Sequence, residues 1–126
     1  HFHGYLPHEE AIKVMSSSQV FLLIEINSEQ TSEIIPGKLF EYLGVNRPVL
    51  ALGPEKWSAG ELITTLKAGA YFSYSQKAEL QTFLLEIFDQ FKNNTLDLAL
   101  NESAQFHRKK LTEDLATIIV NNAIHI

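Results

Sequence analysis

Two glutamates, Glu33 and Glu41, flank a segment that is suited to begin a helix, with seven residues between them. Pro36, Gly37 and Lys38 occupy its expected first turn. The N–H groups of a first turn have no partner within the helix and the dipole is positive there, so this segment suits an anion such as phosphate. Glu41 lies one turn further, where a partly covered carboxylate can accept two sugar hydroxyls. An ordinary surface turn with a solvated glutamate explains the same residues, so both interpretations stay open.

Other patterns that carry chemistry are weak or absent. The chain has no cysteine, which excludes disulfides, thiolate metal sites and cysteine nucleophiles. His1 and His3 would share one face of a strand, but only His8 lies nearby, so no metal site is expected. Trp57 fits a loop anchor better than a platform for a ligand. The sequence also lacks the nucleophile elbow, the phosphate-binding P-loop and the dinucleotide fingerprint.

Size and charge limit the classes of protein. A chain of 126 residues predicts a single domain over residues 1–126, with an α/β core over 1–97 and terminal helices over 98–126. Its formal net charge of −5 makes nucleic acid an unexpected partner. The longest apolar run, Val20–Ile24, is far shorter than a membrane-spanning helix requires.

The elements that must position these residues alternate between strands and helices. Alternation predicts right-handed crossovers and a Rossmann-like three-layer α/β sandwich, with a parallel sheet covered on both faces. Four strands are fewer than such folds usually have, so the sheet is expected to be truncated on its N-terminal side. The expected strands cover 2–6, 20–26, 48–54 and 70–74, and the expected helices cover 9–17, 36–44, 58–67, 77–91 and 98–122.

Local signals set several of these boundaries. Gly44 is expected to end the second helix, and Ser58 with Glu61 forms a capping-box pattern for the third. Phe83, Phe88 and Phe91 form a stripe expected to join the core, and the last helical region is expected to break near Leu111–Thr112. Parallel sheets bind ligands at the carboxyl ends of their strands, which points to the loops 4–7, 27–37 and 53–58.

The segment Glu33–Leu52, E-I-I-P-G-K-L-F-E-Y-L-G-V-N-R-P-V-L-A-L, resembles part of a known family. It is similar to the nucleotide-sugar-binding half of the retaining GT-B glycosyltransferases of the group 1 class. That family has two glutamates separated by seven residues, within a P-x-K-L-F-E-Y-L-A-x-x-R-P-V-L-A segment in one large branch. Residues 2–10, 19–24 and 59–63 resemble its neighbouring elements, so the likeness covers residues 1–75.

The resemblance implies a role for each matching residue. Glu41 would bind the ribose hydroxyls of the donor nucleotide, and Glu33 would be the catalytic-site glutamate that faces the donor sugar. The amides of Gly37 and Lys38 would hold the diphosphate or the sugar, while Gly4 and Tyr5 would lie near the base. The family usually has a glycine-rich stretch after the first glutamate. Since Ile34 and Ile35 stand there instead, Glu29 and Ser32 are alternatives for that role.

The resemblance also implies partners and a cellular setting. The ligand would be a nucleotide-diphosphate sugar, with no cofactor and no metal, and an N-terminal acceptor-binding domain would complete the enzyme. The isolated 126 residues are therefore expected to be inactive. The expected location is cytoplasmic, and the family allows peripheral membrane association of the full protein.

Two other classes of function remain as alternatives. A non-catalytic flavodoxin-like regulatory module needs aspartates clustered after an early strand. The three aspartates, Asp89, Asp97 and Asp114, all lie in the second half of the chain. A protein-interaction module would use the apolar residues of the C-terminal helices.

Overall fold

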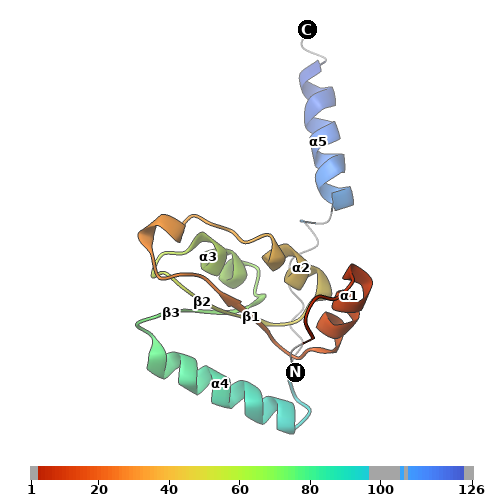
Figure 1. The fold of residues 1–126 in the computed structure, drawn as a ribbon. Coiled ribbons are helices and arrows are strands. Elements are labelled where there is room, and N and C mark those ends of the chain that lie inside the picture. Colours follow the sequence, from red (N-terminus) through yellow and green to blue (C-terminus); the bar gives the residue numbers. More distant parts are fainter. Residues whose placement is uncertain (1–2, 97–105, 107, 124–126) are drawn as a thin grey trace.

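The fold is known from a computed structural model that describes residues 3–96, 106 and 108–123 (Figure 1). Within those residues, short helices and strands alternate up to residue 73, and two longer helices follow. The elements are α1 (His8–Ser17), β1 (Phe21–Ile24), the 3₁₀ helix η1 (Glu29–Thr31), α2 (Lys38–Val45), β2 (Val49–Gly53), α3 (Ser58–Thr65), β3 (Gly69–Ser73), α4 (Lys77–Lys92) and α5 (Arg108–Ala123).

The three strands form a parallel sheet in the order β1-β2-β3. Phe21 is paired with Val49, and Val49 with Gly69, so the strands are aligned at their amino ends. The crossover helices α2 and α3 lie on one face of the sheet and α4 lies on the other (Figure 1). The chain is therefore an α/β protein with a Rossmann-like arrangement, as the alternation of elements predicts.

The core fills the layer between the sheet and the helices α2 and α3. Phe21 and Leu23 point into it from β1, and the Phe21 ring stacks on Tyr42 of α2 with centroids 4.4 Å apart. Leu39 and Leu43, four residues apart on α2, are buried against this layer. Burying a leucine side chain contributes roughly 1.5–3 kcal/mol, so these contacts hold α2 firmly against β1.

The opposite face of the sheet is only partly covered. Phe83 of α4 packs on Phe72 of β3, with ring centroids 5.4 Å apart. Leu22 and Ile24 are 55% and 56% exposed, so the expectation that the first apolar strand is buried on both faces is wrong. The physical reason is that α4 packs against β3, two strands away from β1.

Part of the aromatic stripe on α4 also differs from expectation. Phe83 is half-buried, whereas Phe88 and Phe91 are 55% and 49% exposed. Those two residues are therefore not core residues. The Lys92 ammonium lies 5.0 Å from the Phe88 ring centroid and covers part of this aromatic face.

The N-terminal segment and two helix ends correct further predictions. Residues 3–7 form no strand, so the sheet has three described strands where four were expected. Helix α2 does not stop at Gly44 but continues to Val45, and Asn46 takes the left-handed conformation at φ 57° that ends it. Asparagine tolerates this conformation better than most side chains. Helix α3 begins after Trp57 without a side-chain cap, so Ser58 does not form the predicted capping box.

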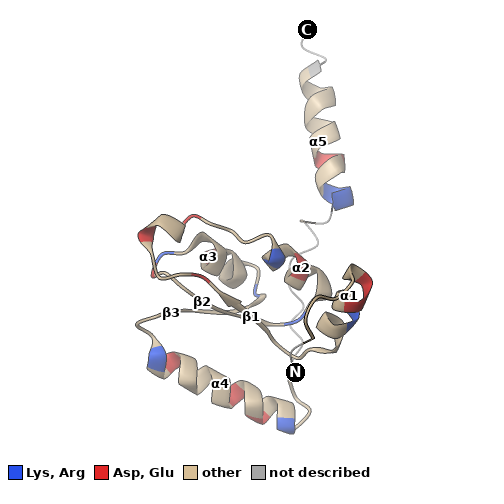
Figure 2. Cartoon of the chain, viewed as in Figure 1, with Lys and Arg blue, Asp and Glu red and all other residues tan. Residues whose placement is uncertain are grey.

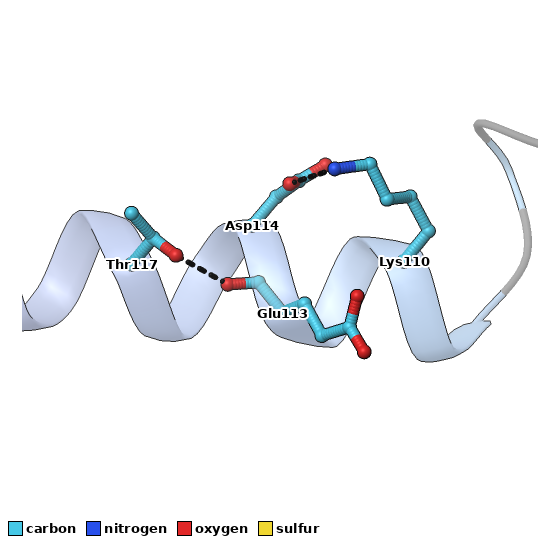
Figure 3. A network of polar contacts seen from close by, with 4 residues as sticks. All are labelled: Lys110, Glu113, Asp114 and Thr117. Atoms are coloured by element: carbon cyan, nitrogen blue, oxygen red, sulfur yellow. Dashed lines mark hydrogen bonds and ion pairs between the residues drawn. The ribbon is translucent and has the colours of Figure 1, made fainter.

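Helix α5 runs unbroken through Leu111 and Thr112, so the predicted break is absent. Lys110 Nζ donates to Asp114 Oδ1 over 2.7 Å, and Thr117 Oγ1 donates to the Glu113 carbonyl over 2.8 Å (Figure 3). The Lys110–Asp114 pair, whose side chains are four residues apart, stabilises the helix locally. Residues 98–105 and 107 of the predicted terminal helix lie outside the described residues.

Candidate ligand-binding site

The segments that leave the carboxyl ends of the three parallel strands surround a cavity of about 660 Å³. Open parallel sheets bind ligands at this edge, because the loops there are free to carry polar groups. The lining residues are Asn27, Ser28, Glu29 and Ser32 after β1, Pro54, Glu55 and Lys56 after β2, and Tyr74 and Ser75 after β3.

Hydrogen bonds fix several polar side chains around this cavity. Tyr74 donates its hydroxyl proton to the Glu25 carbonyl over 2.8 Å, which ties the end of β3 to the end of β1. Ser75 Oγ donates to Glu55 Oε1 over 3.2 Å and lies 2.8 Å from Ser73 Oγ. The Glu55 carboxylate is thus held by the neighbouring strand end while remaining exposed.

Tyr71 holds one of the lining residues of the cavity in place. Its hydroxyl donates to the carbonyl of Pro54, one of the lining residues. Burial raises the pKa of Tyr71, and the negative charges of Glu55 and Glu61 raise it further. The phenol therefore stays protonated near neutral pH and keeps donating to Pro54.

Glu33 lies beside the start of α3 rather than in the cavity lining. Its Oε2 accepts a hydrogen bond of 3.0 Å from Ser58 Oγ, and the Ser58 N–H donates to the Ser32 carbonyl over 2.8 Å. A carboxylate at this end of a helix is favoured by the dipole. In this structure, then, Glu33 and Ser58 tie the loop after β1 to α3.

Trp57 strengthens the same connection. Its side chain is fully buried, and Nε1 donates to the Ile34 carbonyl over 2.8 Å. A Cβ at Gly53 would collide with the indole, so the tryptophan packs directly on the end of β2. The prediction that Trp57 anchors a loop is confirmed.

The residues expected to bind an anion lie at the start of α2. Gly37 is the residue before the helix, Lys38 is its first residue, and both are exposed. The N–H groups of Leu39 and Phe40 donate to the carbonyls of Pro36 and Gly37. This leaves the amides of Gly37 and Lys38 as the candidate donors to a ligand at this end.

Glu41 occupies the first turn of α2 and is exposed, so the expected partial cover by its aromatic neighbours is wrong. Tyr42 packs inward on Phe21, while Phe40 is 43% exposed and meets Phe106 edge-on with centroids 5.8 Å apart. Burial raises the pKa of Tyr42, and the charge of Glu41 raises it further.

Gly4 and Tyr5 precede α1 and do not line the cavity. Gly4 has a φ of 66°, a conformation that favours glycine. The Tyr5 side chain is 97% exposed. The helix α1 that follows these two residues packs against α2 (Figure 1).

The structure thus divides the predicted site residues among separate places. The cavity is lined by none of Gly4, Tyr5, Glu33, Gly37, Lys38 and Glu41. It is lined by Glu29 and Ser32, the two alternatives for the role of Glu33, and by residues of the loop 53–58. Sequence reasoning missed Tyr74 and Ser75, although their position directly after the third strand is the signal that locates them.

The described residues form neither a candidate metal site nor a candidate membrane span. Across residues 3–96, 106 and 108–123, no three His, Cys, Asp or Glu side chains gather where they could hold a metal ion. Within the same residues, every helix is too short or too polar to cross a bilayer.

The fold and the cavity together define an α/β protein with a ligand-sized site at the carboxyl edge of its sheet. No family model, no curated protein and no solved structure matches the chain.

Proposed function

We propose that the chain is the donor-binding part of a retaining GT-B glycosyltransferase, which binds a nucleotide-diphosphate sugar for transfer to an acceptor. The observation that carries the proposal is the start of α2. This helix follows the loop from the carboxyl end of β1, and Gly37, Lys38 and Glu41 are all exposed there. Residues 21–53 run in the order strand, loop, helix and strand, which supports the resemblance.

The chemistry of this end of α2 suits a nucleoside diphosphate. The amides of Gly37 and Lys38 are donors at the positive end of the helix dipole, and the Lys38 ammonium adds a full charge. Glu41 is an acceptor one turn away, and its two oxygens can take both hydroxyls of a ribose. In this proposal the diphosphate binds at the helix start and the ribose binds along the first turn.

The Glu33 carboxylate is less available to a ligand than the resemblance implies. Its carboxylate accepts from Ser58, so one of its oxygens is already engaged at the start of α3. Facing a donor sugar would require this contact to break or to be shared. We therefore assign nucleotide binding to Glu41 and leave Glu33 as the proposed catalytic-site residue that acts on the sugar alone.

The test is a titration of the 126-residue chain with UDP and with GDP, followed through the backbone amide shifts. We expect saturable shifts at Gly37, Lys38 and Glu41, and a roughly tenfold weaker affinity in Glu41→Gln, about 1.4 kcal/mol. Glu33→Gln should bind either nucleotide as the wild type does, because a bare diphosphate lacks the sugar.

Glu79→Gln on α4 is the matched control, since it removes the same charge on the opposite face of the sheet. Shifts that cluster away from the start of α2 would contradict the proposal. So would Glu41→Gln binding as tightly as the control.

A protein-interaction role is the second candidate, and α5 is the observation that favours it. All described side chains of this helix are exposed, including Leu111, Leu115 and Ile118 on one side. A 16-residue helix is marginal without packing, so these residues fit a partner surface. Light scattering across a concentration series tests it, with Leu115→Gln expected to reduce any association.

A further inference from the structure

We propose that the cavity at the carboxyl ends of β1, β2 and β3 binds an uncharged polyhydroxylated ligand of monosaccharide size, with Glu55 as the principal acceptor. This inference does not rest on the proposed nucleotide site. The cavity is lined by none of the residues at the start of α2. Its volume of about 660 Å³ lies within the range of small-molecule sites, roughly 300–1,000 Å³.

The cavity offers both hydrogen-bond acceptors and donors. One oxygen of Glu55 accepts from Ser75, which leaves the other oxygen for a ligand. Asn27 contributes an amide that donates and accepts, and Lys56 contributes an ammonium that donates. A sugar hydroxyl both donates and accepts, so this mixture suits a polyol better than a ligand with acceptors alone.

Tyr74 supplies an apolar surface beside these polar groups. Its hydroxyl is engaged with the Glu25 carbonyl, which fixes the orientation of the ring, and the side chain is 43% exposed. Binding sites usually combine an aromatic surface with a few placed polar groups. The carbon face of a sugar ring is the complement of such a surface.

Charge argues against an anion in the same place. The lining includes the carboxylates of Glu29 and Glu55 but a single cation, Lys56, so it is negative by one unit. Figure 2 shows both signs of charge at this end of the molecule, around η1 and the loop after β2. A phosphate would add negative charge to a lining that is already negative, whereas an uncharged ligand loses nothing by it.

The experiment is a titration of the full 126-residue chain with D-glucose, D-galactose, D-mannose and N-acetyl-D-glucosamine, each followed through the backbone amide shifts. At least one of the four should give saturable shifts at Ser28, Glu55, Lys56 and Ser75. Glu55→Gln should weaken that sugar about tenfold, since the amide keeps the shape but loses the charged acceptor. Glu79→Gln is again the control and should bind as the wild type does.

The outcomes separate this proposal from its rivals. Saturable shifts with loss in Glu55→Gln support it. No saturable shift with any of the four sugars overturns it, as does unchanged binding in Glu55→Gln. Shifts of the same amides by inorganic phosphate or by Ca²⁺, with none by the sugars, overturn it in favour of an ion site. The UDP titration reports on Gly37 and Lys38, so either proposal can fail while the other stands.

Discussion

Replacing Gly60 by alanine sets two known effects against each other. Alanine is favoured over glycine inside a helix by about 1 kcal/mol. A Cβ at Gly60, however, would lie 2.5 Å from Tyr71 Cγ and 2.6 Å from both Cδ atoms, too close for real atoms. The Tyr71 ring cannot withdraw easily, because its hydroxyl is bonded to Pro54 and its edge meets Trp57. Overpacking costs about 1–3 kcal/mol, so after the helical gain of about 1 kcal/mol a net loss of up to about 2 kcal/mol is expected.

Gly44→Ala is the matched control for this change. Gly44 also lies within a helix, but it is exposed and a Cβ there would meet nothing within 4 Å. The same substitution should stabilise the chain by about 0.4–1 kcal/mol. Urea unfolding followed by the fluorescence of the single tryptophan, Trp57, measures both variants. The two midpoints should move in opposite directions, and a Gly60→Ala midpoint at or above the wild type would refute the packing argument.

Three further predictions concern the loop after β1, alkaline pH and activity. Glu33→Ala should lower the free energy of unfolding by about 1 kcal/mol through loss of the Ser58 contact, whereas Glu33→Gln should lower it less. Urea midpoints for the two variants check this. The pKa values of Tyr42 and Tyr71 are raised mainly by burial, so the folded state holds these protons more tightly than the unfolded state does. Stability should be full below about pH 10 and fall as the pH rises through the folded-state pKa values, with the urea midpoint tracking tyrosinate absorbance. The isolated chain should not turn over any nucleotide sugar, and product formed from a donor and an acceptor would contradict this.

The sheet could be predicted from the sequence because its signals are local. Apolar runs of strand length mark β1 and β2, the second of them bounded by proline and glycine, and helical spacing marks the segments between them. The predicted strand around Gly4 is wrong. A strand forms only where a neighbouring strand offers hydrogen bonds, and the pattern of apolar residues does not reveal whether it does. The predicted burial of Leu22 is wrong for a related reason, because it depends on which strand α4 covers, and α4 covers β3.

The wrongly predicted helix ends have a different cause. Ser58 and Glu61 have the spacing of a capping box, but Ser58 lies inside the helix and its hydroxyl donates to Glu33. The Glu33 carboxylate, 25 residues away in sequence, thus binds the hydroxyl that the capping box would have used. Thr112 was expected to begin a new helix, yet α5 continues through it, supported by contacts such as Lys110 to Asp114. Local patterns identify groups that can cap, and tertiary partners decide whether they do.

The loop after β1 explains why the candidate site was only partly predictable. Its polar composition marks it as a ligand loop, but the structure divides it into three parts. Asn27, Ser28, Glu29 and Ser32 line the cavity, Glu33 and Ile34 are held against α3 and Trp57, and residues 36–38 lead into α2. The division follows from three long-range hydrogen bonds, which join Ser32 and Glu33 to Ser58 and Ile34 to Trp57 and so hold the middle of the loop in place. Because the middle is pinned, the cavity and the start of α2 lie on separate stretches of one loop, and each can be tested without disturbing the other.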